Sequence, residues 1–109
     1  MRTLKFIVDG QIIIQDPNCD FSGLVPGTEK YLKAVFKFSS DWDDCVKVAA
    51  FYSVMGKEYP PRVLTAGTEC MIPAEALERR AFKVRVLGQK GSTKITTNKV
   101  KVDQNGGKA

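Results

Sequence analysis

The segment FKVRVLG (residues 82–88) alternates apolar and basic side chains, and this alternation decides the fold class. Phe82, Val84 and Val86 fall on one side of an extended chain, and the basic residues between them fall on the other. This pattern is typical of a strand with one face in a core and one face in water. The sequence therefore predicts a β-strand at this position.

Comparable patterns occur along most of the chain and predict seven or eight short strands. Asp9-Gly10, between two apolar runs, predicts a tight hairpin turn. A pair of prolines at 60–61 places its segment at the edge of a sheet. Short strands separated by turn signals are typical of sandwiches and barrels, and we expect an all-β fold with a single antiparallel β-sandwich. The expected strands are residues 4–8, 11–15, 31–38, 46–53, 58–64, 69–72, 82–88 and 93–103.

One short helix is expected near residues 73–80, where Pro73 suits the first helical position and the charges suit the helix dipole. The β-sandwich domain is expected to span residues 1–103. Residues 104–109 are polar and rich in glycine, which predicts a flexible C-terminal tail. A chain of 109 residues is one domain's worth, and it can form a core without metal or disulfide links.

Composition excludes several kinds of site. The chain has no histidine, which excludes a Ser-His-Asp or Cys-His catalytic unit and any histidine-ligated metal site. Its three cysteines form no CxxC pair, so we expect reduced thiols and synthesis in a cytoplasm. No apolar run resembles a signal peptide or a membrane span, so we expect a soluble protein without a membrane partner. We expect no enzymatic activity, catalytic residue, cofactor or metal.

The only tryptophan, Trp42, lies among Asp41, Asp43 and Asp44, and this cluster admits several interpretations. The carboxylates offer oxygen ligands for a hard cation, but the apolar Val46 stands where a calcium loop would need a ligand. Paired acids also suit general acid–base catalysis, although no second acidic cluster faces them. An exposed tryptophan beside acids would make a platform for a sugar. The favoured interpretation is a turn that carries Trp42 into the core.

Most of the aromatic side chains fall on strand positions that should point inward. Basic residues outnumber acidic ones by 17 to 12, which gives a formal charge of +5. Many of them alternate with apolar residues as the wet face of a strand does, so a nucleic-acid partner is not expected. The expected core anchors are Trp42, Phe36, Phe38, Phe51, Phe82, Val84 and Val86.

Five motifs follow one another between residues 31 and 103: F-x-F-S-x-x-W-D, A-x-F, C-x-I-P-x-E-x-L, F-x-V-x-V-x-G and I-T-T-N-x-V-x-V. In this order they resemble a family of small structural proteins of tailed phages and prophages from Gram-positive hosts. The chain is similar to the N-terminal domain of the baseplate upper protein. The resemblance implies an all-β module that attaches to the virion and has no catalytic residues.

That domain is often followed by a longer fibre-like or receptor-binding region, whereas this sequence stops at Ala109. This favours a tail or baseplate adaptor, or a head or tail decoration module. The implied partners are other phage structural proteins, and we expect a homo-oligomer in the virion because phage parts assemble with rotational symmetry. The implied location is the virion, after synthesis in the cytoplasm of the host bacterium.

The N-terminal hairpin and the loop of residues 16–30 are the candidate contact surface. The apolar residues of this loop either dock a partner or cap the core. Two alternative functions stay open: a carbohydrate-binding β-sandwich module that uses Trp42 and its acids, and a basic nucleic-acid-binding protein. The candidate docking residues are Phe21, Leu24 and Val25.

Overall fold

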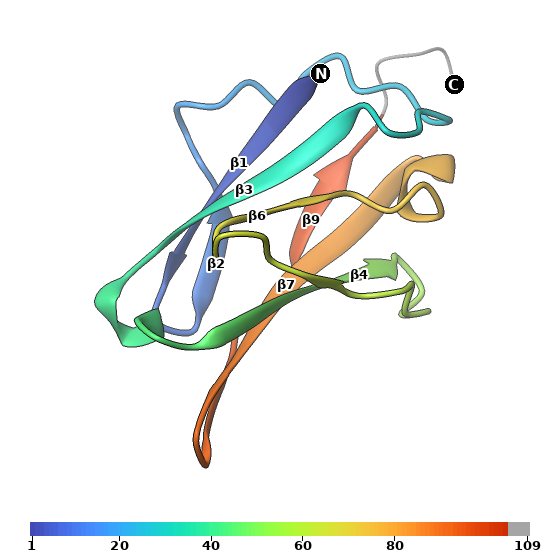
Figure 1. Cartoon of the computed structure of the whole chain (residues 1–109). Coiled ribbons are helices and arrows are strands. Elements are labelled where there is room, and N and C mark those ends of the chain that lie inside the picture. Colours follow the sequence, from blue (N-terminus) through green and yellow to red (C-terminus); the bar gives the residue numbers. More distant parts are fainter. Residues whose placement is uncertain (105–109) are drawn as a thin grey trace.

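Two packed sheets form the part of the chain that a computed structural model describes, residues 1–104 (Figure 1). The expected all-β sandwich is confirmed, because the described residues form nine strands and only two single turns of 3₁₀ helix. The strands are β1 (Arg2–Asp9), β2 (Ile12–Gln15), β3 (Leu32–Phe38), β4 (Val46–Ser53), β5 (Arg62–Val63), β6 (Glu69–Met71), β7 (Ala81–Lys90), β8 (Thr93–Thr96) and β9 (Val100–Asp103); the 3₁₀ turns are η1 (Ser40–Trp42) and η2 (Ala76–Glu78).

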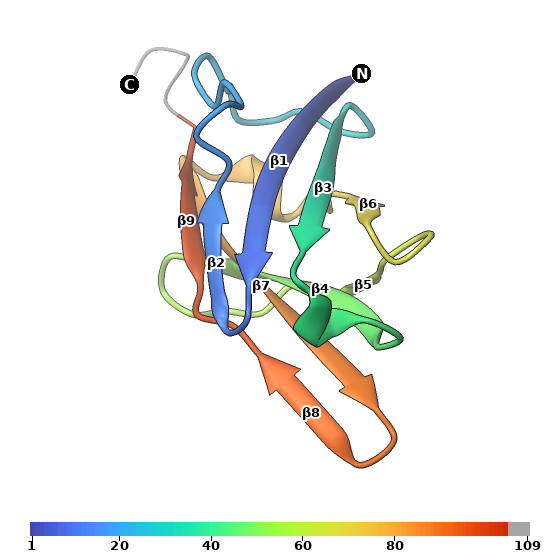
Figure 2. The same ribbon diagram turned by 90° about the vertical axis from the view of Figure 1, so that its left-hand side faces the viewer.

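The strand order is β2-β1-β3-β6 in the first sheet and β5-β4-β7-β8 in the second, where β9 also pairs with β7. β8 and β9 follow one another along the same edge of β7, because β8 pairs with residues 87–90 and β9 with residues 81–84. Figure 2 shows the β7–β8 hairpin extending beyond the end of the first sheet. The hairpin therefore enlarges the second sheet at that end.

One strand pair is parallel, which corrects the expectation of a purely antiparallel sandwich. β1 and β3 run in the same direction, from Arg2 opposite Leu32 to Val8 opposite Phe38. Parallel neighbours need a long connection. Here β2 and the loop of residues 16–31 bring the chain back to the end where β1 begins, so β3 must enter alongside β1 in the same direction.

The expected helix near residues 73–80 is only the single turn η2. A segment of this length is too short to gain much from helix formation alone. Ala76 and Leu77 are both fully buried and hold the turn against the core. Arg79 already has an extended backbone, with φ −108° and ψ 167°, because the chain must enter β7 directly afterwards.

Two predicted strands differ in extent from those observed. The predicted strand 93–103 is divided into β8 and β9 at Thr97, whose hydroxyl accepts a bond from the Val86 amide at 3.1 Å. The predicted strand 58–64 is shortened to β5, because Pro60 and Pro61 have no N–H group to donate to a ladder. β5 lies at the edge of the second sheet, as the proline pair predicts.

The core lies between the sheets and contains the predicted anchors. Phe38 is only half-buried, at the end of β3, where its ring centroid lies 5.1 Å from that of Trp42. Lys33 and Lys37 alternate with the inward residues of β3, as the period-2 pattern predicts. The fully buried anchors are Trp42, Phe36, Phe51, Phe82, Val84 and Val86.

Polar links join the two sheets at their edges. The Asn98 carboxamide oxygen accepts a bond from the Ile13 amide at 2.8 Å, and its nitrogen donates to the Ile13 carbonyl at 3.3 Å. This side chain connects β2 of the first sheet to the β8–β9 connection of the second. At the other side of the sandwich, a turn joins β5 to β6 through a bridge between Thr65 and Glu69. These links cover parts of the strand edges.

Gln104, predicted as the first residue of a flexible tail, is fully buried. Its side-chain nitrogen donates to the carbonyl oxygens of Leu77 at 3.1 Å and Arg79 at 2.8 Å. These bonds attach the end of β9 to the η2 turn, so the domain extends past its predicted boundary at residue 103. The rest of the predicted tail, residues 105–109, lies outside the described residues.

Candidate docking surface

The acidic turn (residues 39–45) carries the Trp42 indole into the core. The Trp42 amide donates to the Ser39 carbonyl at 3.1 Å, which closes the η1 turn. The indole N–H donates to the Gly10 carbonyl at 2.8 Å, so the one polar atom of the ring is satisfied. A Cβ atom at Gly88 would lie only 2.7 Å from the ring, so β7 accommodates the indole because this residue is glycine.

The acids around Trp42 are not gathered into a cluster of metal-ligating side chains. Within residues 1–104, no three His, Cys, Asp or Glu side chains lie close enough to hold an ion. Asp44 instead lies 3.7 Å from the Lys90 ammonium group. Asp41 and Asp43 line an open groove together with Lys94. The mixture of charges in this region argues against a dedicated cation site.

The interpretation of Trp42 as an exposed sugar platform is wrong. Its side chain is 0% exposed, because it fills the space between β7 and Phe38. Stacking on a sugar needs an accessible ring face, and this indole has none. A carbohydrate site using Trp42 would require the core to open.

The loop of residues 16–30 is divided between core and surface. Leu24 is 3% exposed and belongs to the core, so its predicted docking role is wrong. Phe21 is half-buried and packs edge-on against Phe6, with ring centroids 5.5 Å apart. Of these three residues, only Val25, at 49% exposed, presents about half of its surface to water. Two of the three predicted docking residues therefore cap the core.

The cysteine thiols are free in the structure. Cys70 is buried on β6, and this burial raises the pKa of its thiol to about 12. A thiol with such a pKa stays protonated at neutral pH, and the thiolate is the nucleophilic form. Cys70 therefore acts as a small apolar residue of the core.

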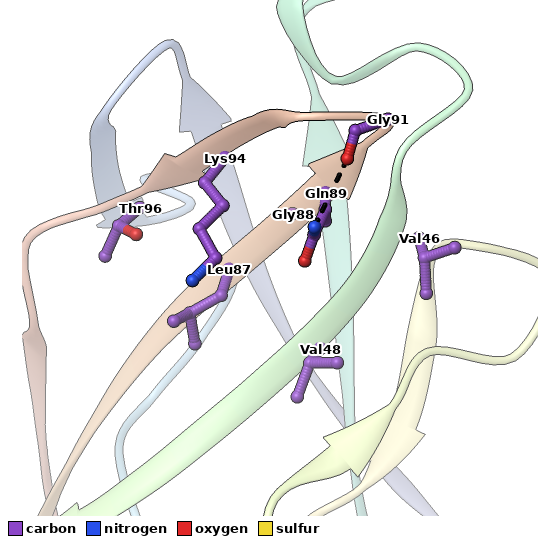
Figure 3. A pocket seen from close by; sticks show the side chains of 8 residues that line it. All are labelled: Val46, Val48, Leu87, Gly88, Gln89, Gly91, Lys94 and Thr96. Carbon is purple, nitrogen blue, oxygen red and sulfur yellow. Dashed lines mark hydrogen bonds between the residues drawn. The ribbon is translucent and has the colours of Figure 1, made fainter.

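The outer face of the second sheet carries an apolar groove that the sequence did not single out. Val46 and Val48 of β4 stand opposite Gln89 and Leu87 of β7 in the strand register. Lys94 and Thr96 of β8 complete one side of the same hollow, as Figure 3 shows. This hollow is called the outer groove below; its volume is about 580 Å³, and it is lined by Val46, Val48, Leu87, Gly88, Gln89, Gly91, Lys94 and Thr96.

Two valines at this face are strongly exposed. Val46 is 65% exposed, and Val63 of β5, which pairs with Val48, is 69% exposed. Neighbouring strands bring both residues to the same side of the sheet, because paired residues share a face. The apolar surface of the outer groove therefore continues onto the edge strand.

The other half of the same face is basic, and it is called the cationic half below. The Tyr52 ring lies under two cations: the Lys99 ammonium is 3.9 Å and the Arg85 guanidinium 5.3 Å from its centroid. Arg85 also donates a hydrogen bond to the Tyr52 hydroxyl at 2.9 Å. These contacts leave Tyr52 only 4% exposed. The cationic half consists of Lys83, Arg85, Lys99 and Lys101.

Sequence reasoning missed the outer groove because β4 is apolar on both sides. In VKVAAFYS (residues 46–53), Ala49 and Phe51 point inward, whereas Val46 and Val48 belong to the opposite set. Alternation alone does not tell which apolar set faces the core when both sets are apolar. The useful signal was that valines occupied positions where a solvated strand would carry polar residues.

Comparisons with protein-family models, with curated proteins and with solved structures match this chain to none of them. Among the described residues, no helix is long and apolar enough to cross a bilayer.

Proposed function

We propose that this chain is a non-enzymatic structural protein of a phage virion, and that it docks other virion proteins on the outer face of its second sheet. The observation that carries the docking role is the outer groove, where branched aliphatic side chains remain exposed. The five motifs that resemble phage structural proteins supply the virion setting. The proposed place is a tail or baseplate adaptor, or a decoration module of the head or tail.

Docking on this face is favourable because it removes apolar surface from water. Complete burial of one valine side chain contributes roughly 1.5 kcal/mol or more. Val46 and Val63 retain most of that potential gain in the isolated chain. Contiguous exposed apolar patches of this kind commonly mark interaction sites on soluble proteins.

The links at the sheet edges favour docking through a face. Asn98 bonds the backbone of β2, and the Thr65–Glu69 bridge joins β5 to β6. A partner strand would therefore meet covered backbone at these edges. We also propose several copies of the chain in each virion, related by rotation as in other symmetric assemblies.

Mass spectrometry of purified virions, from the phage or prophage that encodes the chain, tests the proposal. We expect the wild-type chain in the particles and loss of the double variant Val46→Asp, Val63→Asp. The control is Ile12→Asp with Ile14→Asp, because these residues are also exposed but lie on the first sheet. Circular dichroism of each variant checks that it folds. Absence of the wild-type chain from the virions, or full retention of the valine variant, would contradict the proposal.

A further inference from the structure

We infer that the partner segment which occupies the outer groove is an acidic polypeptide, with apolar side chains in the groove and carboxylates over the cationic half. This inference rests on the proposed docking function and adds the chemistry of the partner. The apolar groove and the cationic half lie on one continuous face, since Arg85 and Leu87 are successive outward residues of β7.

The charges of this face are strongly unbalanced. Among the described residues it carries five cations and only two carboxylates, a net charge of +3. Asp103 is already paired with Lys101 at 3.6 Å, and Glu58 lies at the edge beside Tyr52. The cations are Lys83, Arg85, Lys94, Lys99 and Lys101.

The outer face of the first sheet has a different balance. Its strands present three lysines and two carboxylates within the described residues, a net charge of +1. Lys33 is paired there with Glu69 at 3.3 Å. Lys5, Lys37 and Asp9 complete the set. Electrostatic attraction of an acidic partner is therefore directed to the second sheet.

A nucleic-acid partner fits this face less well than an acidic polypeptide does. Binding of single strands uses exposed aromatic rings for base stacking, whereas the Tyr52 ring is covered by cations. Exposed valines find no complement in a phosphate backbone. A second copy docking through the same face would place like charges opposite one another, which is unfavourable.

The geometry of the groove suits an amphipathic segment. Val46 and Val48 lie on one side of the groove and Lys94 on the other, with Leu87 between them on β7 (Figure 3). Apolar side chains of a partner would contact the three aliphatic residues. Carboxylates beside them would reach Lys94 at one side and Arg85 along β7.

A titration of the ¹⁵N-labelled full chain with synthetic probes, followed by nuclear magnetic resonance, tests the inference. The main probe is a peptide of about ten residues that alternates leucine and glutamate, long enough to lie across several strands. We expect amide shifts in β4, β7 and β8. We also expect a dissociation constant about tenfold lower than for the matched leucine–lysine peptide, because charge complementarity favours the acidic probe.

Two further probes separate the contributions of charge and apolar contact. A serine–glutamate peptide keeps the charge and lacks apolar side chains, and we expect it to bind more weakly. A short DNA duplex supplies phosphates alone. Equal or tighter binding of the duplex would overturn the inference in favour of nucleic acid. Amide shifts confined to the first sheet, or no amide shifts with the leucine–glutamate peptide, would also overturn it.

Matched charge reversals provide the control for this titration. Lys83→Glu with Lys101→Glu should weaken the leucine–glutamate peptide about tenfold, because the cationic half loses its sign. Lys5→Glu with Lys37→Glu changes the net charge by the same amount on the other sheet and should leave binding near the wild-type value. Equal losses in both variants would show that only net charge matters and would overturn the inference.

The outcomes for the two proposals are distinguishable. Specific binding of the acidic peptide by a chain that is absent from virions would refute the virion role and support the inferred partner chemistry. Presence of the chain in virions without preference for the acidic peptide would support the virion role and refute the inferred partner chemistry.

Discussion

Gly88 and Trp42 pack against each other where β7 meets the acidic turn. The indole lies across β7 at a residue without a side chain, and it donates its N–H to the Gly10 carbonyl of the opposite hairpin. Gly88, which has no side chain, thus leaves the space on β7 that the Trp42 ring of the acidic turn fills. The only tryptophan of the chain therefore packs against the second sheet and bonds to the β1–β2 turn of the first.

Replacement of Gly88 by alanine should destabilise the fold. The added Cβ would lie 2.7 Å from the Trp42 ring and 3.1 Å from Ile95, so either the indole or β7 must shift. Overpacking of this kind typically costs about 1–3 kcal/mol. Urea unfolding followed by tryptophan fluorescence measures the change in the free energy of unfolding.

The control for this prediction is a double-mutant cycle with Trp42→Phe, followed by circular dichroism. A smaller ring should make Gly88→Ala less costly, because residues in contact are not additive. Equal costs in both backgrounds would show that Gly88 and Trp42 do not interact in the way described.

Cys70 should resist modification by thiol reagents in the folded protein. Its burial raises the pKa of the thiol to about 12, so the reactive thiolate is scarce at pH 8. We expect Cys70 to react at least about tenfold more slowly than the half-buried Cys19 and Cys45, because reaction requires both thiolate and access. Timed alkylation followed by peptide mass spectrometry measures the three rates. Comparable rates would mean that β6 opens readily.

At the level of elements, the Asn98 side chain makes the two hydrogen bonds to Ile13 that the backbone of a neighbouring strand would make. Its carboxamide carries both an N–H donor and a carbonyl acceptor, as a peptide group does. Both are used on Ile13. The side chain therefore extends the hydrogen bonding of β2 across to the other sheet.

Loss of the Asn98 carboxamide should loosen β2. Asn98→Ala removes two hydrogen bonds, each contributing about 0.5–1.5 kcal/mol, so we expect roughly 1–3 kcal/mol of lost stability. Asn98→Asp keeps an acceptor for the Ile13 amide, but it places a carboxylate oxygen against the Ile13 carbonyl, so it should also lose stability. Chemical denaturation gives the free energies, and hydrogen exchange of the Ile13 amide reports the local effect. The matched control is Asn18→Ala in the exposed 16–30 loop, and an equal loss there would contradict the assignment.

Local patterns predicted most of the strands, because period-2 alternation reports directly on burial. The β1–β3 pairing was not predictable in this way, since it depends on where the loop of residues 16–31 returns the chain. The helix near residues 73–80 had correct local signals, but the demand of β7 for an extended chain overrode them.

Prediction of the candidate site was less successful, for a physical reason. Phe21, Leu24 and Val25 were chosen because apolar residues in a loop suggest contact with a partner, yet the core itself needs apolar residues from loops to cover its ends. The outer groove is assembled from β4, β7 and β8, which only the folded sheet brings together. The role of the acidic turn could be predicted because the turn-forming residues and Trp42 lie within a few positions of one another in the sequence.

For the whole molecule, the two sheet faces differ in both charge and apolar exposure. The second sheet joins an apolar groove to a cationic half, whereas the first sheet carries nearly balanced charges. Of the two outer sheet faces, the second therefore carries most of the net positive charge among the described residues. Such an asymmetry orients a molecule as it approaches an acidic partner.

The exposed valines should contribute little to folding. Val63→Asp and Val46→Asp each change a side chain that is mostly in water, so we expect the free energy of unfolding to stay within about 1 kcal/mol of wild type. Thermal and urea unfolding measure this. Ala49→Asp provides the contrast, because that residue is fully buried on the same strand and an unpaired buried charge is strongly destabilising. A large decrease in the free energy of unfolding of the valine variants would show that these valines stabilise the fold.

The bonds between Ile13 and Asn98 join positions 85 residues apart, and this separation has a consequence for biosynthesis. During translation, the edge of the β1–β2 hairpin emerges early and stays open until Asn98 has left the ribosome. Folding dominated by such distant pairings is slow. A nascent or prematurely terminated chain should therefore be the form most prone to aggregation and most dependent on chaperones.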